Sequence, residues 1–434
     1  MASHSEWITA TVMSGIALVL VTGVLLGKVA RKLRQPPVIG EILAGIVLGP
    51  SLLGLLPGRL SARLFPAEAR PYLAMIAQVG LLLFMFAIGW EFEVRLLQRR
   101  RHRAAAVSLS SIALAFTMGV GLAVLLYARH SEVRGHHVAF LPFALFLGVA
   151  MSITAFPVLA RILVDNGLIS TPIGTLALAS AAIDDVLAWC LLALVAAIAT
   201  AGGPGDLVRT AGFAAVYVAA MALLVRPLLR ALVHRLTRDR VSPYLPIVLS
   251  AGVFVSSYAT TQIGIHAIFG AFAFGIIMPR EPAEALRAHV KPPLEHVSMV
   301  LLPIFFIVTG LSVDIGSVTG RGYLEMLAIV LVACAGKLLG AAVPAKLSGM
   351  SWQDARTVGI LMNTRGLTEL IVLSVGASLG ILDGQMFTMM VMMALITTAL
   401  AGPLLPRVRQ HATADQSADA AQPTDELVAS QADA

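Results

Sequence analysis

The sequence predicts an all-α membrane protein that crosses the bilayer many times. Its 434 residues are 58% hydrophobic and only 13% charged, with a mean hydropathy of +0.86. Ordinary soluble domains are about 45–50% apolar and about 25% charged. The chain also contains about a dozen apolar stretches near the length of about 20 residues that a membrane-spanning helix requires. We therefore expect a polytopic membrane protein and no enzyme, and we attribute the net charge of +7 to helix ends rather than to nucleic-acid binding.

Hydropathy predicts thirteen membrane spans. They cover approximately residues 7–27, 36–56, 72–90, 104–127, 138–163, 172–200, 207–230, 244–262, 264–279, 293–313, 323–346, 355–377 and 386–405. Basic residues concentrate in cytoplasmic loops and so test the alternation of these spans. With the N-terminus outside, 22 Lys and Arg residues fall on the cytoplasmic side and 7 on the other. We expect a multi-pass protein of the inner (plasma) membrane with a cytoplasmic C-terminus.

An internal repeat relates the two halves of the chain. The matching residues are Gly40 and Gly45 with Gly270 and Gly275, Phe84 and Gly89 with Phe305 and Gly310, and Gly148 and Met151 with Gly359 and Met362. These matches pair spans 2, 3 and 5 with spans 9, 10 and 12. The shift is an odd number of spans, so the halves run through the membrane in opposite directions. Inverted repeats are typical of secondary transporters, whose site lies near the midplane where the halves meet.

The repeat also predicts the domain layout. A transmembrane domain is expected over residues 1–410, and a disordered cytoplasmic tail over 411–434, which contains few large apolar residues. Within the domain, repeat 1 is expected at about 7–200, a linker helix at about 207–230 and repeat 2 at about 244–405. Spans 4–6 then correspond to spans 11–13, and these two triplets carry the mid-span polar residues described next.

Two adjacent carboxylates, Asp184 and Asp185, lie in the middle of the apolar run 173–199. A charge at the centre of a membrane helix costs a few kcal/mol or more and is therefore a candidate functional group. We interpret the pair as a site for a monovalent cation or a proton that faces a protein interior or a water-filled cavity. The alternative is two acids at a helix end that reach the membrane surface. Apolar sequence continues for more than ten residues on each side and disfavours it.

Span 5 is expected to break in its middle. Pro157 has no N–H group and crowds the carbonyl of Ile153, so a regular helix ends there. Free backbone groups at such a break, together with the dipole ends of the half-helices, can face a buried ion. Ser152 and Thr154 lie beside the break, and we expect their hydroxyl groups to contribute to the ion or proton site. The alternative for this span alone is a simple proline kink.

Span 12 carries the equivalent break in repeat 2. Asn363 and Thr364 can bond to freed backbone groups, and Gly366 allows the backbone to leave helical geometry. Two broken helices at equivalent positions of inverted halves are expected to cross near the midplane. The crossing would place both breaks next to the carboxylates of span 6.

Three further charged residues lie deep within predicted spans. Lys337 is deep in span 11 and needs a carboxylate partner, for which Asp184 is the simplest choice. Asp185 would then be free to bind a metal cation or a proton, but not both. Arg365 and Glu369 are four residues apart on one helix face and can form an ion pair. We interpret this second pair as mainly structural, with a role in ion handling as the alternative.

Taken together, these motifs resemble the monovalent cation/proton antiporter superfamily. The resemblance covers about residues 8–405 and rests on segment 35–50, the break at 154–157, the aspartate pair and segment 363–370. The nearest branch contains bacterial sodium/proton antiporters, Kef-type potassium efflux systems and plant CHX exchangers. The resemblance implies a homodimer in which spans 4–6 and 11–13 move as a core against a dimerisation domain. It also implies that Asp185 is the essential ion-binding residue, and that Asp184 and Lys337 are the pair typical of electrogenic members.

The sequence therefore predicts a secondary active transporter that exchanges Na⁺ or K⁺ for protons by alternating access. The expected partners are these ions and membrane lipid; no cofactor, nucleotide, nucleic acid or metal beyond the transported cation is expected. One alternative is a proton- or sodium-coupled carrier of an organic solute, in which Lys337 could bind an anionic group. Another is a gated cation channel, although the sequence contains no recognisable filter of backbone carbonyls.

Overall fold

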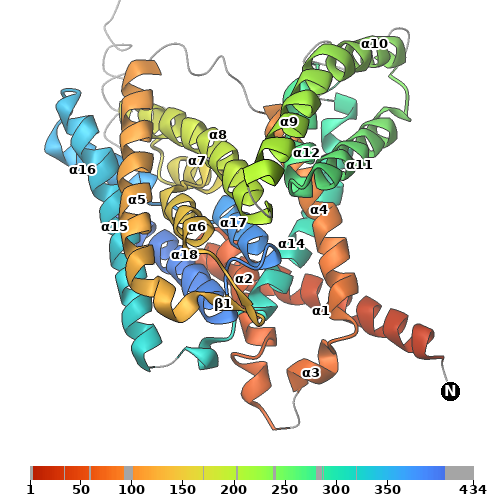
Figure 1. Ribbon diagram of the computed structural model, residues 1–434, viewed down its shortest axis with the longest axis horizontal. Helices are drawn as coiled ribbons and strands as arrows, with labels where there is room; N and C mark the ends of the chain where they lie inside the picture. Colours follow the sequence, from red (N-terminus) through yellow and green to blue (C-terminus); the bar gives the residue numbers. More distant parts are fainter. Residues whose placement is uncertain are drawn as a thin grey trace, which may run out of the picture.

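The computed structural model describes residues 3–405 apart from 34, 58–59, 92–100, 170, 202–203, 238–240, 280–285, 287 and 319. Within these residues the chain is mostly helical and contains a short β-hairpin at residues 132–137 (Figure 1). The predicted disordered tail, 411–434, lies outside the described residues.

The first half of the chain ends in a long helix that carries the two aspartates. Its elements are α1 (His4–Lys32), α2 (Pro37–Leu48), η1 (Leu53–Leu55), α3 (Leu60–Leu64), α4 (Arg70–Glu91), α5 (Arg101–His130), β1 (Glu132–Val133), β2 (His136–His137), α6 (Phe140–Ser152), α7 (Phe156–Asp165) and α8 (Pro172–Thr200). Helix α8 begins where its sequence favours it, because Thr171 accepts a hydrogen bond from the Gly174 N–H and Pro172 occupies the first turn.

The second half repeats this order of helices after a linker. Its elements are α9 (Pro204–Ala220), η3 (Met221–Val225), α10 (Arg226–Thr237), α11 (Leu245–Ile263), α12 (Ala267–Ile277), α14 (Lys291–Leu311), η4 (Ile315–Ser317), α15 (Gly320–Leu347), α16 (Trp352–Met362), α17 (Leu367–Ser378) and α18 (Gly384–Leu404). Polar N-cap residues again stabilise the first turns of helices. Ser351 caps α16 by accepting a hydrogen bond from the Asp354 N–H, and Asp383 caps α18 by accepting one from the Met386 N–H.

Each of the thirteen predicted spans has a helical counterpart, but the number thirteen is not confirmed. Among the described residues, ten helices are long and apolar enough to cross a membrane, or eleven if the bent pair α16–α17 is one span. Helix α12 has only 11 residues, and α11, with 19 residues, is not among those eleven. A polytopic helical membrane protein is therefore confirmed, whereas the exact span count is not.

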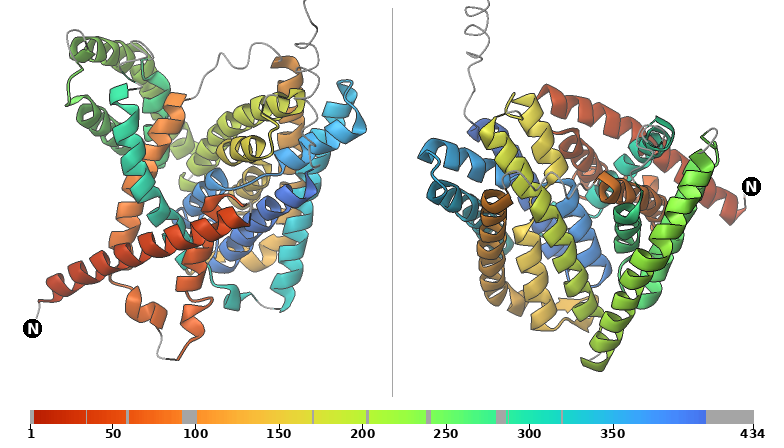
Figure 2. Two further views of the ribbon diagram at one scale, coloured as in Figure 1. Left: turned by 180° about the vertical axis from the view of Figure 1, so that it is seen from behind. Right: turned by 90° about the horizontal axis from the view of Figure 1, so that it is seen from above.

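The helices form two groups that lie side by side (Figure 2). In the group that we call the core, α5 packs against α6, α8 and α15, and α15 packs against α16 and α18. In the group that we call the panel, α2 packs against α1 and α14, while α4 packs against α12 and α14. The core joins helices of both chain halves, α5 to α8 and α15 to α18, so it is built only when the halves come together.

Close glycine contacts in the panel repeat between the two halves. Gly45 of α2 packs against Gly310 of α14 so closely that a Cβ atom on either would collide with the partner backbone. Gly89 of α4 and Gly275 of α12 meet in the same way. The sequence repeat equates Gly45 with Gly275 and Gly89 with Gly310, so the two crossings are copies of one contact. Only glycine permits this approach, which explains why the repeat is readable at these positions.

Candidate ion site at the crossed helix breaks

The two predicted breaks lie against each other. Helix α6 ends at Ser152, residues 153–155 are extended, and α7 begins at Phe156 with Pro157 in its first turn. Helix α16 ends at Met362, and α17 begins after Gly366, with a bend of 42° between the two.

Hydrogen bonds join the extended segments directly. The Ala155 N–H donates to the Thr364 carbonyl at 3.0 Å, and Thr154 Oγ1 lies 2.8 Å from the Met362 carbonyl oxygen. The backbone groups that each break leaves without a helical partner are thus partly satisfied by the other break. The predicted crossing of two broken helices is confirmed.

Asp184 is contacted by side chains from two other helices and from the extended break at residues 153–155. Lys337 Nζ of α15 lies 2.8 Å from Asp184 Oδ2. Ser108 of α5 donates to Oδ1 at 2.5 Å, and Thr154 Oγ1 lies 2.8 Å from Oδ2. Asp184 and Lys337 are both completely buried, and Ser111 of α5 accepts a further bond from Lys337 at 3.2 Å. The predicted ion pair is present, and its two charges neutralise each other inside the core.

Among the described residues, Asp185 has fewer hydrogen-bond partners than Asp184, and the side-chain partner is more distant. Thr368 Oγ1 of α17 is 3.5 Å from Asp185 Oδ1, and the Phe156 backbone N–H is its other hydrogen-bond donor. Phe156 is the first residue of α7, and Thr368 lies in the first turn of α17. Both half-helices therefore direct the positive end of their dipole toward this carboxyl group. Asp185 retains 6% of its surface exposed, whereas Asp184 has none.

Arg365 connects the second break to the C-terminal end of α6 through hydrogen bonds. Its Nη1 and Nη2 atoms donate to the carbonyls of Ala150 and Met151, each at 2.6 Å, and Nη1 also lies 2.9 Å from Glu369 Oε2. Thr398 of α18 donates to the Arg365 carbonyl at 2.7 Å. We expected free carbonyls at the break to face the ion. Those of Ala150 and Met151 instead bind this arginine, because a permanent cation satisfies them at the end of α6.

The remaining predicted site residues lie at the breaks but do not contact Asp185 through a hydrogen bond. Ser152 donates to the Val149 carbonyl of its own helix, and Thr364 donates to the Leu361 carbonyl. Asn363 donates to Cys334 Sγ, and its buried Oδ1 has no hydrogen-bond partner in the described part of the chain.

Four groups around the aspartates were missed in the sequence. Ser108 and Ser111 are three residues apart in an apolar helix and so share a face, which was a usable signal. Thr368 directly precedes Glu369, a residue that was predicted. The Phe156 N–H carries no sequence signal beyond the proline that follows it, because a backbone donor is revealed only by the break itself.

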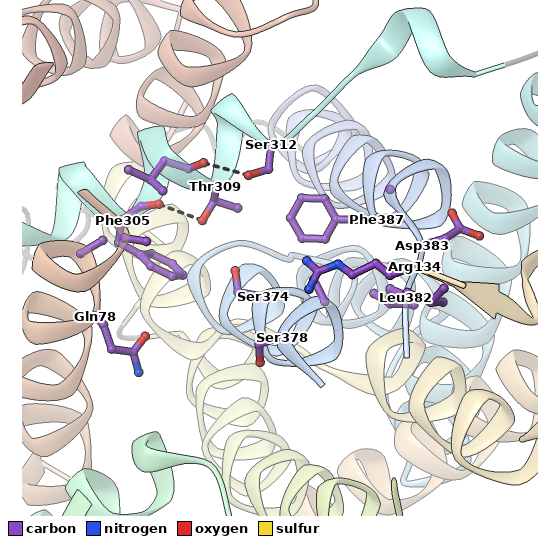
Figure 3. Close-up of a pocket in the computed structure, with 16 residues that line it drawn as sticks. Gln78, Arg134, Phe305, Thr309, Ser312, Ser374, Ser378, Leu382, Asp383 and Phe387 are labelled. Carbon is purple, nitrogen blue, oxygen red and sulfur yellow. Dashed lines mark hydrogen bonds between the residues drawn. The ribbon is translucent and has the colours of Figure 1, made fainter. Parts of the chain in front are cut away.

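A cavity of about 560 Å³ opens between core and panel (Figure 3). Helices α4 and α14 contribute Gln78, Phe305, Thr309 and Ser312 on one side. Helices α17 and α18 and the β-hairpin contribute Ser374, Ser378, Asp383, Phe387 and Arg134 on the other. Ser374 lies six residues beyond Thr368 on α17, about 9 Å along the helix at 1.5 Å per residue. The cavity therefore reaches toward the level of Asp185 from one side of the membrane.

One charge in this cavity is paired and the other is not. Asp383 Oδ2 lies 2.5 Å from His130 Nδ1, and His130 Nε2 lies 3.3 Å from Glu325. Burial opposes ionisation of Asp383, but the hydrogen bonds from His130 and from the Met386 N–H outweigh it and lower the Asp383 pKa. Arg134, by contrast, forms no ion pair with any described residue and projects into the cavity near Ser374 (Figure 3).

Crossed helix breaks beside a buried carboxylate define the class of this protein as a secondary ion transporter built from inverted repeats. The chain belongs to the sodium/hydrogen exchanger family: the family model described as "Sodium/hydrogen exchanger, transmembrane" matches residues 16–410. The family resemblance inferred from the motifs is thereby confirmed.

Relatives of known name agree with this assignment. The Na(+)/H(+) antiporter NhaS4 of Synechocystis sp. is 39% identical over 400 residues, which cover 92% of this chain and 97% of the relative. The K(+)/H(+) antiporter 1 of Saccharomyces cerevisiae is 34% identical over 86% of this chain, which spans only 43% of that longer protein. The solved structure of the sodium proton antiporter MjNhaP1 of Methanocaldococcus jannaschii has the same fold, with a TM-score of 0.60 at 15% identity over 92% of this chain and 96% of that one.

The family membership answers the question of function class. The protein is a multi-pass membrane transporter that exchanges a monovalent cation for protons, not an enzyme. The two alternatives considered from the sequence, an organic solute carrier and a cation channel, are not favoured by any of these relatives.

Proposed function

We propose that Asp185 is the residue at which Na⁺ or K⁺ and a proton replace each other during transport. The observation that carries this proposal is the unequal engagement of two adjacent carboxylates. Asp184 has its charge balanced by Lys337 at 2.8 Å and receives two further hydroxyl contacts. Asp185 contacts one distant hydroxyl and one backbone N–H, so its oxygens have lone pairs to offer a cation or a proton.

The surroundings of Asp185 suit an exchange rather than permanent binding. Two helix N-termini stabilise its negative charge in the absence of a ligand. A buried carboxylate still favours neutralisation, and either a proton or a monovalent cation provides it. Thr154 and Asn363 lie beside the same crossing and can supply neutral oxygen ligands. The neutralised core then moves relative to the panel, so that the site opens in turn to each side of the membrane.

The finer assignments of this proposal come from the sequence. Repeat 1 at about 7–200, the linker helix at about 207–230 and repeat 2 at about 244–405 form one transmembrane domain. The protein is a homodimer in the inner (plasma) membrane, with its N-terminus outside and its C-terminus in the cytoplasm. The basic residues, 22 on one side against 7 on the other, support this orientation. The second ion pair, Arg365 with Glu369, is structural.

The direct test compares Asp185→Asn with the wild-type protein in proteoliposomes that contain a pH-sensitive dye. Addition of Na⁺, K⁺ or Li⁺ separately should release protons through the wild type and identify the transported cation. Asp185→Asn should show no cation-dependent signal, because an amide can neither release a proton nor balance a cation. Asp206→Asn, which changes an exposed acid on α9, is the matched control. Wild-type exchange rates in Asp185→Asn would refute the proposal.

A further inference from the structure

A second pocket lies where α15 turns into α16. It has a volume of about 540 Å³ and is lined by Leu338, Leu339 and Ala342 of α15 and by Trp352, Gln353 and Arg356 of α16. Helices α15 and α16 pack closely at Gly359, where a Cβ atom would crowd Leu338 and Ala342. The pocket is therefore a groove between α15 and α16 beside this contact.

The α15 wall of the groove is apolar and faces outward. Leu339 is 54% exposed, although it follows Lys337, a completely buried residue, by only two positions. Val343 and Leu347, one and two turns further along the same helix, are also exposed. Helix α15 is long and apolar enough to cross the membrane, so this exposed surface lies against lipid chains rather than water. The groove therefore extends along the membrane interior.

The other end of the groove is basic and aromatic. Trp352 is 62% exposed, and Lys346 Nζ lies 5.8 Å from the centre of its ring. Arg356 lies one turn further along α16 and is exposed. Neither Lys346 nor Arg356 is in an ion pair with a described residue. Asp354, the carboxylate in this turn, lies two positions from Arg356 and so points to a different side of the helix.

Along the membrane normal, apolar residues are followed by aromatic and basic ones, just as the acyl chains of a phospholipid are followed by its headgroup. Leu338 adjoins Lys337, which lies at the depth of the buried ion pair, and Lys346 is nine residues further on, about 14 Å at 1.5 Å per residue. Apolar side chains thus occupy the membrane interior. Tryptophan and the two cations occupy the level where lipid headgroups lie, and this is where Trp, Lys and Arg are favoured in membrane proteins.

We propose that this groove binds an anionic phospholipid. One acyl chain lies along Leu338, Leu339 and Ala342, and the phosphate lies between Lys346 and Arg356, where two cations without carboxylate partners favour a lipid with net negative charge over a zwitterionic one. The site is on the core, on the helix that carries Lys337 and on the one that leads to the break at 363–366. A bound lipid would hold these two helices together while the core moves.

The test uses the full-length protein in a neutral detergent and measures its thermal unfolding midpoint with added phosphatidylglycerol or phosphatidylcholine of the same chain length. Phosphatidylglycerol should raise the midpoint of the wild type by several degrees, because a ligand that binds only the folded state stabilises it. Phosphatidylcholine should have a smaller effect. The double variant Lys346→Gln, Arg356→Gln should lose most of the difference between the two lipids.

Two further variants separate this site from general lipid effects. Leu339→Trp keeps both cations but fills the apolar groove, and it should also reduce the response to phosphatidylglycerol. Arg321→Gln removes an exposed arginine at the opposite end of α15 and should leave the response unchanged. An equal response to phosphatidylglycerol in the wild type and the double variant would overturn the proposal. A change of oligomeric state in the double variant, with the lipid response intact, would assign the groove to a second copy of the chain and would overturn it as well.

Discussion

The two helix breaks occupy equivalent positions in the repeat, yet the side chains beside them contact different groups. At the first break, Thr154 and the Phe156 N–H reach the aspartates of α8. At the second break, Arg365 reaches back to the carbonyls of Ala150 and Met151 and leaves Thr368 as the contact to Asp185. Both breaks therefore contact the aspartates, but only the second also supplies a cation, which binds the carbonyls at the end of α6.

The charges of the core divide between the halves in the same way. The first half contributes Asp184 and Asp185 on α8, whereas the second half contributes Lys337 on α15 and the pair of Arg365 with Glu369 at the start of α17. Each cation of the second half contacts groups of the first half. The two inverted halves thus contain the same kind of backbone break with different side chains, and these side chains make each half depend on the other. Variants can test how strict that dependence is.

The largest effect is expected from Arg365→Ala. It would leave two buried carbonyls without donors and the buried Glu369 without its partner. Breaking a buried charge pair typically costs about 3–5 kcal/mol, and the carbonyls add to it. We expect little folded protein on size-exclusion chromatography. Arg365→Lys should recover part of the yield, since one cation cannot replace both guanidinium contacts. A folded, active Arg365→Ala protein would show that the breaks are independent.

Lys337→Ala should destabilise the fold by about 3–5 kcal/mol, because it leaves Asp184 charged and buried without its cation. Thermal unfolding measures this loss, and transport under an imposed voltage reports any change in electrogenicity. The double variant Lys337→Ala, Asp184→Asn should be more stable than Lys337→Ala alone. If Lys337→Ala had normal stability and an unchanged voltage response, the two charges would not act as a pair.

Thr154→Val tests the first break with a change of nearly constant volume. It removes a hydroxyl group that lies 2.8 Å from both Asp184 Oδ2 and the Met362 carbonyl. An unsatisfied buried acceptor costs about 1–3 kcal/mol, so we expect a lower unfolding midpoint and slower exchange. Thr154→Ser keeps the hydroxyl and serves as the control. Equal loss in both variants would attribute the effect to packing rather than to the hydrogen bonds.

Asp383→Asn should remove a pH-dependent contribution of about 1 kcal/mol, which is modest because the pair with His130 is partly exposed. The pKa of Asp383 is lowered in the folded protein, so its stabilising effect is present at neutral pH and disappears as the pH falls below about 4. Asparagine can still cap α18. Unfolding midpoints of wild type and variant between pH 3 and pH 7 should converge at the acid end, and a constant difference would contradict the pairing.

The smallest effect is expected from Arg134→Asn. Arg134 and Gly135 both have positive φ, 52° and 79°, in a hairpin turn that asparagine adopts readily, so the variant should fold normally. Removing the unpaired cation from the cavity should lower the half-saturating cation concentration on that side roughly twofold at low salt. The effect should vanish at high ionic strength and be absent in Arg134→Lys. An unchanged value at low salt would exclude the cavity as the entry route on that side.

Much of the site was predictable because charged residues are rare in membrane spans. Asp184, Asp185 and Lys337 could be identified as buried charges from hydropathy alone, and only one carboxylate was needed to satisfy the lysine. The breaks were predictable from Pro157 and Gly366. The hydrogen-bond partners of Arg365 were not predictable, because they are backbone carbonyls more than 200 residues away and carry no side-chain signal.

The sequence by itself determined that the chain is a helical membrane protein built from two inverted halves with charges at its centre, because hydropathy and local backbone chemistry act over a few turns of helix. The tertiary structure decided which aspartate pairs with Lys337 and which one remains without an ion-pair partner among the described residues. That choice depends on Ser108 of α5, Thr154 of the extended break and Lys337 of α15 converging on Asp184. Such convergence is a property of packing between halves of the chain, and no local pattern encodes it.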